Sequence, residues 1–290
     1  MKIITILSGK GGVGKSSITA SLALALSKDK KIICADCDVD ASNLALVFGA
    51  ENFEKWDDIS TNEKAVFDLD KCGSCKRCFE ACYFNAIDWV DNKPMLKDFS
   101  CEGCGACELV CKKGAITLEK VNNAKIGYAN TKYGFEVTSA QLNPGESGSG
   151  KIVAAVKEKA KKLASDSEIL LVDSAAGIGC PVIASVTGSD FAVIVTEPTP
   201  SGFSDMKKAL QIVDHFKIQK GVIINKYDLN EEQTGNIKKF VKEKNIPILG
   251  EIPYDKRFTE ALTKMIPITK YDETFEELFE TIKNNVIELL

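Results

Sequence analysis

The chain has 290 residues, of which 44% are hydrophobic and 27% charged, a composition typical of a globular protein with one large and one small domain. Its net charge of −4 and its single histidine indicate neither a nucleic-acid-binding surface nor catalysis built on histidine. The longest apolar runs fall short of the ~18 residues of a membrane-spanning helix, and the N-terminus lacks the features of a signal peptide. We therefore expect a cytoplasmic protein that binds neither nucleic acid nor membrane.

The first 60 or so residues predict the start of a parallel sheet. Lys2–Leu7 and Lys31–Asp36 are short apolar runs, and Lys15–Lys28 between them has helical character. This strand–helix–strand order with short connections is typical of an α/β fold. Further strands are expected at 124–129, 134–142, 168–173, 191–196, 221–225 and 246–252, and further helices at 151–163, 201–216, 231–244 and 272–290.

The stretch from Gly9 to Ser16 has the pattern G-x-x-x-x-G-K-[S/T], between a predicted strand and a predicted helix. That context is typical of a phosphate-binding loop, in which backbone N–H groups and the helix N-terminus attract phosphate. We expect Lys15 to reach the β- and γ-phosphates and the Ser16 hydroxyl to bind Mg²⁺. The expected nucleotide contacts of the loop are Gly9, Lys10, Gly11, Gly12, Val13, Gly14, Lys15, Ser16 and Ser17.

Eight of the eleven cysteines fall between Cys72 and Cys111. Disulfides are rare in the cytoplasm, so dense cysteine favours metal binding. The stretch contains two copies of C-x₂-C-x₂-C-x₃-C, the second starting 29 residues after the first, at Cys101. Such thiolate runs are typical of two [4Fe–4S] clusters, and a pair of zinc sites is the alternative. We place this insert at residues 61–118, between the two parts of the larger domain at 1–60 and 119–290. A long insertion into a surface loop is tolerated, because it costs little closure entropy.

The two cysteine runs resemble those of bacterial two-cluster ferredoxins, in which the fourth cysteine of each run binds the other cluster. The proline that usually follows the fourth cysteine is replaced here by Tyr83 and Lys112. The resemblance implies one cluster on Cys72, Cys75, Cys78 and Cys111, and the other on Cys101, Cys104, Cys107 and Cys82.

Lys10, within K-G-G-V-G-K-S, resembles the signature lysine of the deviant Walker A ATPases, the superfamily of MinD, ParA, Mrp-type carriers and the nitrogenase iron protein. In that superfamily the lysine crosses a dimer interface to the phosphates of the partner subunit. The resemblance implies a homodimer, at least with ATP bound, and catalytic roles for Lys10 and Lys15. A second cation there stabilises charge on the transferring phosphoryl group.

Two further segments are similar to the switch regions of this superfamily. Ala35–Leu44 is similar to switch I, which implies that Asp36 lies near Mg²⁺ and that Asp38 positions the attacking water. Asp40 is interpreted as a surface or capping residue. Ile169–Gly177 is similar to the Walker B and switch II segment, which implies that Asp173 lies in the magnesium shell.

The nucleotide base is less closely specified. Asn225 to Asp228 read N-K-x-D, the guanine-recognition pattern of GTPases. In the MinD-like group the asparagine at this position contacts adenine, so we favour ATP over GTP, with Asn225 and Lys226 as contacts. The segment 250–255 resembles the base-side loop of the family, which implies that Pro253 and Tyr254 lie near the base edge.

Three cysteines lie outside the insert. Cys34 is interpreted as a small core residue, and Cys37 lies between two carboxylates that disfavour its thiolate. Cys180 follows Asp173 at an offset similar to that of a bridging-cluster cysteine in the nitrogenase iron protein, but no second ligand is visible. We favour a buried cysteine at a helix start. The last predicted helix has an acidic polar face, which disfavours binding to anionic lipid.

Together these features predict an α/β P-loop NTPase with a mostly parallel sheet flanked by helices, interrupted by a small α+β ferredoxin-like insert with two [4Fe–4S] clusters. ATP and Mg²⁺ are the other expected cofactors. We expect nucleotide turnover to control iron–sulfur chemistry, since hydrolysis reorders the switch loops. That chemistry is either low-potential electron transfer to a redox partner or cluster assembly for a client protein. The alternative is a MinD/ParA-type positioning switch with structural clusters.

Overall fold

The computed structural model describes residues 1–50, 52–146 and 148–290. The chain divides into two compact units. The sheet unit comprises Met1–Trp56, Ile126–Gln141 and Gly148–Leu290, and the cysteine unit comprises Asp57–Lys125 and Leu142–Ser147. The predicted insert, 61–118, lies within the cysteine unit, which also includes residues on both sides of it.

A nine-stranded sheet has the strand order β13-β12-β11-β1-β10-β2-β9-β8-β3. Every neighbouring pair from β13 to β9 is parallel, which confirms the predicted mostly parallel α/β sheet. The carboxyl ends of these strands therefore lie along one edge, where open α/β sheets bind their ligands. The strands are β1 (Lys2–Ser8), β2 (Ile32–Cys37), β3 (Lys55–Ile59), β8 (Ala124–Asn130), β9 (Glu136–Leu142), β10 (Ile169–Ala176), β11 (Phe191–Thr196), β12 (Gln219–Asn225) and β13 (Ile248–Ile252).

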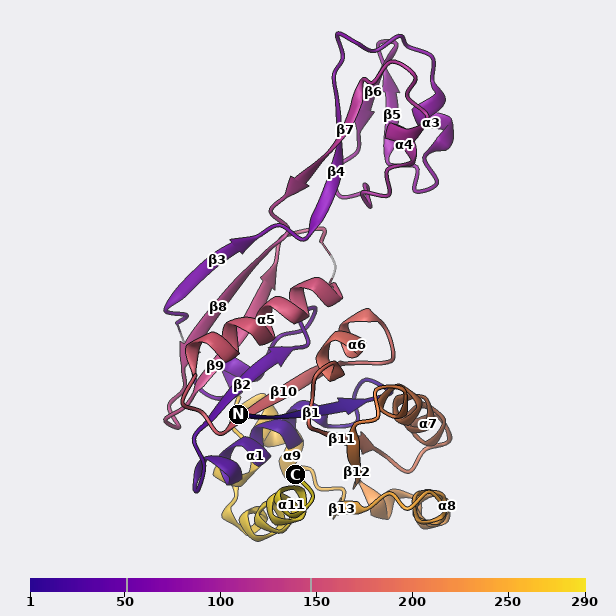
Figure 1. Cartoon of the computed structure of the whole chain (residues 1–290). Helices are drawn as coiled ribbons and strands as arrows, with labels where there is room; N and C mark the ends of the chain where they lie inside the picture. Colours follow the sequence, from indigo (N-terminus) through magenta and orange to yellow (C-terminus); the bar gives the residue numbers. More distant parts are fainter. Residues whose placement is uncertain (51, 147) are drawn as a thin grey trace. The chain divides into compact units, whose positions relative to one another are not determined.

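Helices cover both faces of this sheet (Figure 1). Alternate residues of β11 show why, since Val193 packs into one apolar core and Ile194 into the other. Helices α1 (Lys15–Ser27), α2 (Leu44–Val47), α9 (Arg257–Thr263), α10 (Ile268–Tyr271) and α11 (Glu276–Glu288) pack into the first core. Helices α6 (Cys180–Val186), α7 (Pro200–His215) and α8 (Glu231–Glu243) pack into the second, and α5 (Gly150–Leu163) packs against α6.

The C-terminal helix begins a few residues later than predicted. The Asp272 carboxylate accepts a hydrogen bond from the Thr274 N–H and starts a 3₁₀ turn, Glu273–Phe275, and α11 follows this turn. The apolar face of α11 is buried against the sheet core, as predicted for a packing helix. No helix among the described residues has the length and apolar character needed to cross a membrane.

The cysteine unit is built from two short antiparallel pairs, β4 with β7 and β5 with β6, and two one-turn helices. Its elements are β4 (Asn62–Phe67), α3 (Arg77–Ala81), β5 (Ile87–Val90), β6 (Lys93–Leu96), α4 (Ala106–Leu109) and β7 (Ile116–Val121). The apolar core is small and includes two cysteine side chains among its buried members, Ala65, Cys78, Ile87, Cys107 and Ile116. Such a core gives limited stability by itself, which is typical of small domains that a metal group completes.

One buried lysine stabilises the region around α6. Lys157, on α5, is 4% exposed, and its Nζ donates hydrogen bonds to the carbonyl oxygens of Ser185, Thr187 and Ala184. These carbonyl groups lie at the C-terminal end of α6, where backbone carbonyls have no N–H partner within the helix. Burial lowers the pKa of Lys157 to about 8. The amine therefore serves as a C-terminal cap for the helix that follows β10.

We predict that Lys157→Met lowers the free energy of unfolding by about 2–3 kcal/mol, because the apolar volume is kept while buried carbonyls lose their donor. Urea unfolding measures this, with exposed Lys162→Met on the same helix as a control that shifts stability by less than about 0.5 kcal/mol. The pKa of Lys157 lies below its ordinary value of 10.5, so the unfolded chain binds more protons between these two values. Wild-type stability relative to Lys157→Met should therefore rise with pH across that window, and equal stability of the two proteins would contradict the capping role.

Candidate functional site

The loop between β1 and α1 has the backbone that the glycine pattern predicts. Gly12 and Gly14 have φ of 79° and 90°, the left-handed region that favours glycine. A Cβ added to Gly14 would lie 2.5 Å from Nδ2 of Asn225. That amide donates a 2.7 Å hydrogen bond to the Val13 carbonyl oxygen, so the end of β12 supports the loop. The predicted loop residues and Asn225 are thus brought together.

A buried ion pair lies under this loop. Lys15 is 6% exposed, and its Nζ lies 2.8 Å from Oδ1 of Asp173, the one carboxylate in β10. Thr19 Oγ1 donates a second hydrogen bond, also of 2.8 Å, to the same oxygen. The other oxygen, Oδ2, is buried and has no hydrogen-bond partner. A buried acceptor without a hydrogen-bond partner needs a ligand, a water or an ion. The free oxygen of Asp173 is therefore available to the Mg²⁺ that the sequence predicts there.

Two carboxylates from the end of β2 lie next to this pair. Asp36 is 1% exposed and accepts hydrogen bonds from the backbone N–H groups of Leu44 and Asp38. Burial, followed by the nearby Asp173 carboxylate, raises the pKa of Asp36 to about 7. Asp38 lies 3.9 Å from Lys15, and burial raises its pKa while the lysine opposes this. The predicted switch residues therefore gather around one lysine.

The described residues contain no group of three or more His, Cys, Asp or Glu side chains arranged around a single metal ion. Mg²⁺ does not require such a group, since it is usually held by one or two protein oxygens together with water and substrate phosphates. Ser16 and the free oxygen of Asp173 are donors of this kind. The donor set therefore fits Mg²⁺ bound together with a nucleotide.

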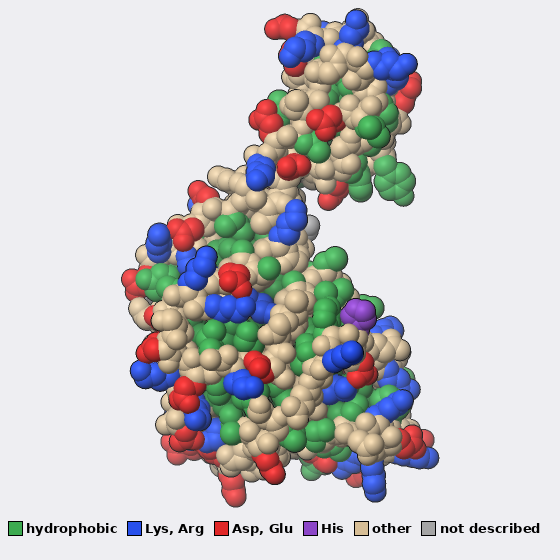
Figure 2. Space-filling view, in the orientation of Figure 1, with side chains coloured by type: hydrophobic (Ala, Val, Ile, Leu, Met, Phe, Trp, Pro, Cys, Tyr) green, Lys and Arg blue, Asp and Glu red, His purple; other side chains and the backbone are tan. Residues whose placement is uncertain are grey.

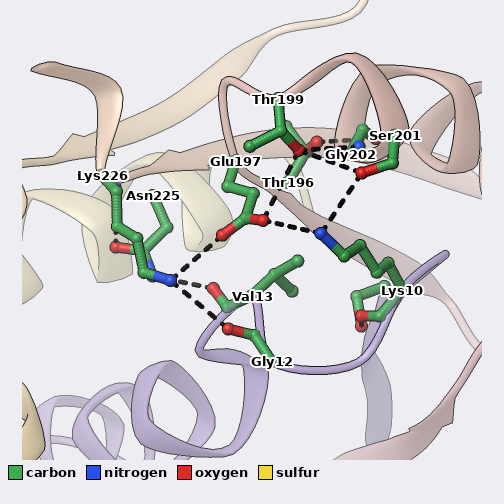
Figure 3. Close-up of polar contacts among 11 residues, drawn as sticks. Lys10, Gly12, Val13, Thr196, Glu197, Thr199, Ser201, Gly202, Asn225 and Lys226 are labelled. Carbon is green, nitrogen blue, oxygen red and sulfur yellow. Dashed lines mark hydrogen bonds and ion pairs between the residues drawn. The ribbon is translucent and has the colours of Figure 1, made fainter. Parts of the chain in front are cut away.

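Lys10 is held by a carboxylate that the sequence did not single out (Figure 3). Its Nζ lies 3.0 Å from Oε1 of Glu197 and 3.2 Å from Oγ of Ser201. The second oxygen of Glu197 lies 3.0 Å from Nζ of Lys226, which also donates to the Gly12 carbonyl. Burial opposes ionisation of Glu197, but hydrogen bonds from Lys10 and Lys226 outweigh it and lower the pKa of this carboxyl. Glu197, which directly follows β11, thus pairs with both Lys10 and Lys226.

The predicted base-side residues lie near one another. The Tyr254 backbone N–H donates a 2.6 Å hydrogen bond to Oδ1 of Asp228, and its ring is 47% exposed. Pro253 precedes it after β13, and Asn225 accepts a hydrogen bond from the Lys226 N–H. Asp40 is an exposed surface residue, and its carboxylate accepts a 2.8 Å hydrogen bond from the Gly148 N–H, just before Ser149, the N-cap of α5.

Two cavities in the cysteine unit gather the eight clustered cysteines in two sets of four. The first, with about 420 Å³ of unfilled space including open solvent, is lined by Cys72, Cys75, Cys78 and Cys111. The second, with about 350 Å³, is lined by Cys101, Cys104, Cys107 and Cys82. Each set contains three cysteines of one run and the fourth of the other. We name these the Cys72 cavity and the Cys101 cavity.

The two cysteine runs have the same backbone. Left-handed residues occur at equivalent positions, which are Ser74, Lys76 and Asn85 in the first copy and Gly103, Gly105 and Gly114 in the second. The Ala86 and Ala115 N–H groups donate hydrogen bonds to the sulfur atoms of Cys82 and Cys111, at 3.2 and 3.3 Å. Hydrogen bonds from amides to sulfur favour thiolates over thiols. Non-glycine residues cost about 1–2 kcal/mol each in this conformation, so the first copy retains a strained loop.

The remaining cysteines differ in exposure. Cys34 is a fully buried core residue as predicted, and burial raises the pKa of its thiol. Cys37 is fully buried too, and burial, with a contribution from the Asp36 carboxylate, raises its pKa, in line with the predicted disfavoured thiolate. Cys180 is the first residue of α6, as expected, but it is exposed, so the prediction of a buried cysteine is wrong. The helix turns Val182, Ser185 and Val186 toward the core, and this register directs its first residue outward.

Comparisons with known proteins agree with the fold of the sheet unit. The sequence matches the family described as the CobQ/CobB/MinD/ParA nucleotide binding domain over residues 4–268. An uncharacterized protein of Methanocaldococcus jannaschii is 36% identical over 288 residues, which is 97% of this chain and 96% of that protein. The iron-sulfur cluster carrier protein of the same organism is 25% identical, over 98% of this chain and 83% of the carrier. The structure of septum site-determining protein MinD from Pyrococcus horikoshii, complexed with Mg-ADP, has a similar fold, with a TM-score of 0.61 at 20% identity, and covers 99% of this chain and 96% of that chain.

We predict that Gly14→Ala destabilises the nucleotide-free protein by about 3 kcal/mol, through left-handed strain and displacement of the Asn225 amide. Gly12→Ala is the matched control, because its φ is similar but an added Cβ meets nothing within 4 Å. It should cost only the strain, about 1 kcal/mol. Thermal or urea unfolding of both variants makes the comparison, and equal losses would show that Asn225 does not restrict the loop.

Proposed function

This chain belongs to the CobQ/CobB/MinD/ParA nucleotide-binding family, and on that basis we propose that its ATPase cycle controls iron–sulfur chemistry in the cysteine unit. The chain is an ATPase of the MinD/ParA type. The observation that carries the iron–sulfur proposal is the pair of cavities, each lined by four cysteines drawn from both runs. Because the cysteines of this protein are unpaired thiols and its clusters need reduced thiolates, we place it in the cytoplasm.

The nucleotide site has one set of residues for each task. Lys15 binds the β- and γ-phosphates once they draw it from Asp173, and Ser16, Asp36 and Asp173 hold Mg²⁺ directly or through water. Asp38, beside Lys15, orients the attacking water. The contacts to phosphate come from the backbone of the loop, which Asn225 keeps in place.

ATP suits the base side better than GTP. Recognition of guanine by N-K-x-D needs both oxygens of the aspartate, one for N1–H and one for the exocyclic amine. Here Oδ1 of Asp228 already accepts a hydrogen bond from the Tyr254 N–H, which leaves this oxygen one acceptor site fewer for guanine. An adenine makes no such demand, and the loop of Pro253 and Tyr254 then borders the base.

Lys10 supports a homodimer as the hydrolytic form. Among the residues that the structure describes, its Nζ contacts Glu197 and Ser201 and none of the predicted catalytic carboxylates. A cation that stabilises the transferring phosphoryl group has to reach the phosphates. We propose that Lys10 does so across a dimer interface, on the nucleotide of the partner subunit, after leaving Glu197.

The cysteine cavities fit two [4Fe–4S] clusters. Each supplies four thiolates, a small apolar surrounding and, at Cys82 or Cys111, an amide hydrogen bond to sulfur. Single zinc ions fit less well, since no three of these cysteines converge on one ion position within the described residues. Clusters bound there supply one-electron chemistry, and the cysteines of both runs fasten the unit around them.

Four protein thiolates per cluster favour electron transfer to a redox partner over cluster donation, because a donated cluster has to leave its ligands. The similarity to an iron-sulfur cluster carrier protein supports cluster delivery to a client protein as the second candidate. A positioning switch with structural clusters is the third. Cluster potentials and iron retention measured with and without ATP distinguish the third candidate, which predicts no change in either.

We predict that the anaerobically purified protein is brown and contains about eight irons per chain, four for each cavity. Crossed ligation is tested with paired Cys→Ser variants. Cys75→Ser with Cys111→Ser removes two ligands of one cavity and should leave about four irons, while Cys75→Ser with Cys82→Ser removes one ligand from each cavity and should impair both clusters. Iron analysis and electron paramagnetic resonance of the reduced proteins give the readout. A colourless zinc protein, or the reverse order of the two variants, would contradict the proposal.

We predict that Lys10→Ala binds ATP within about threefold of wild type but hydrolyses it at least about 100-fold more slowly, since the transferring phosphoryl group loses a cation. Asp38→Asn should be equally slow for want of an oriented water. Mixing the two variants restores about a quarter of wild-type activity if Lys10 acts in trans, because half of the random dimers are mixed and each has one complete site. No recovery on mixing would place Lys10 in its own site.

A further inference from the structure

We propose that four basic residues around the Cys72 cavity form a docking surface for an acidic one-electron redox protein. The residues are Lys76, Arg77, Lys112 and Lys113, and we call them the basic rim. The proposal rests on the proposed function in one respect, since it takes the Cys72 cavity to hold a cluster. Beyond that function, the proposal specifies that the Cys72 cavity exchanges electrons with the partner and that the partner presents an acidic surface.

The two cavities differ in charge although their backbones are equivalent. The Cys72 cavity is lined by the four cationic residues of the basic rim and no carboxylate, and the Cys101 cavity by one carboxylate, Glu102, and no cation. The repeat explains this position by position. Lys76 and Arg77 correspond to Gly105 and Ala106 in the second run, and Lys112 and Lys113 correspond to Tyr83 and Phe84 in the first. The asymmetry therefore comes from the side chains alone.

The basic rim is accessible and has no carboxylate partner among the described residues, although the Arg77 side chain interacts with the Cys75 sulfur. Lys76, Lys112 and Lys113 are exposed and Arg77 is half-buried. In the part of the chain that the structure describes, none of the four forms an ion pair with a carboxylate, whereas Lys71 and Lys97 of the same unit do. Lys76 lies over the Trp89 ring at 5.7 Å instead. Figure 2 shows Lys and Arg side chains on the surface of this unit, interspersed with Asp and Glu side chains.

Compensation of cluster charge accounts for Arg77, which interacts with Cys75, but it does not account for the three lysines of the basic rim. A cluster on four thiolates is anionic in either cavity, so both cavities have the same need of positive charge. Only one has it, and the chain as a whole is acidic, with a net charge of −4. Unpaired like charges on one face repel each other and raise the potential there, which accelerates association with an acidic surface in a salt-dependent way. One electron then passes between the cluster of this cavity and the partner, and no atom is transferred.

Stopped-flow oxidation of the dithionite-reduced holoprotein tests this, with oxidised rubredoxin as the acidic one-electron probe and cytochrome c as the basic one. For rubredoxin we expect the second-order rate constant to fall about 10-fold between low and physiological ionic strength, and about 10-fold again in Lys112→Glu/Lys113→Glu. The matched control is Lys120→Glu/Lys125→Glu, which changes charge equally in the same unit but lines neither cavity, and should stay within about twofold. For cytochrome c the rim variant should react faster than wild type.

Iron content and reduced-state spectra of each variant are measured first. A wild-type protein without clusters refutes the proposed function, whereas equal rubredoxin rates in loaded rim and control variants overturn the docking surface alone. If Lys112→Glu/Lys113→Glu loses iron from the Cys72 cavity, the neutral Lys76→Gln/Lys113→Gln variant replaces it, with an expected decrease of about threefold. Iron loss from both variants would show that the basic rim serves the cluster and not a partner.

Discussion

The buried contact between Lys15 and Asp173 is the interaction on which the nucleotide site depends. It joins the first turn of α1 to the end of β10, and Thr19 adds a second donor to the same carboxylate oxygen. A charge removed from water is tolerated only when it is paired, so this pair fixes the phosphate-binding lysine before any nucleotide arrives. It also leaves one oxygen of Asp173 without a partner, and the neighbouring Asp36 is too buried to ionise readily. The site is therefore assembled but electrostatically incomplete, and in the function we propose Mg²⁺ with a triphosphate would supply what it lacks.

The sequence predicts a part of the fold or of the site well when the residues that form it are contiguous in the chain. The phosphate-binding loop and the cysteine runs are short motifs, and their residues lie together in the structure as expected. Glu197 carries no motif, and its role depends on β11 lying beside β1, which is a property of the sheet order. The burial of Cys180 was predicted wrongly, because exposure of the first residue of a helix depends on which face packs, and a short helix gives little periodic signal. A better indication for Glu197 was available, since polar residues at the carboxyl ends of parallel strands converge on one edge.

The repeat shows how one backbone serves two chemical environments. Left-handed turns recur at equivalent positions, so the arrangement of thiolates is set by the chain path and does not depend on glycine, as Ser74 and Lys76 show. The side chains that point to solvent are then free to differ, and they differ in charge around the two cavities. Because net charge and exposure tune the reduction potential of a bound cluster, the clusters that we propose would form two unequal redox sites on one repeated backbone.

If Lys10 leaves Glu197 during the cycle as we propose, the surroundings of Glu197 would make that release reversible. Removing one partner from a fully buried ion pair costs about 3–5 kcal/mol, because an uncompensated charge stays behind, but this pair is only partly buried, with Lys10 37% and Glu197 11% exposed. Here the carboxylate has a second lysine, Lys226, on its other oxygen, and this lysine also contacts the phosphate-binding loop through the Gly12 carbonyl. When Lys10 leaves for a phosphate, Glu197 is still paired, so departure costs much less than for an isolated pair. The same shared carboxylate is there to receive Lys10 again once the phosphate has gone, which is what a lysine that acts once in each ATPase cycle requires.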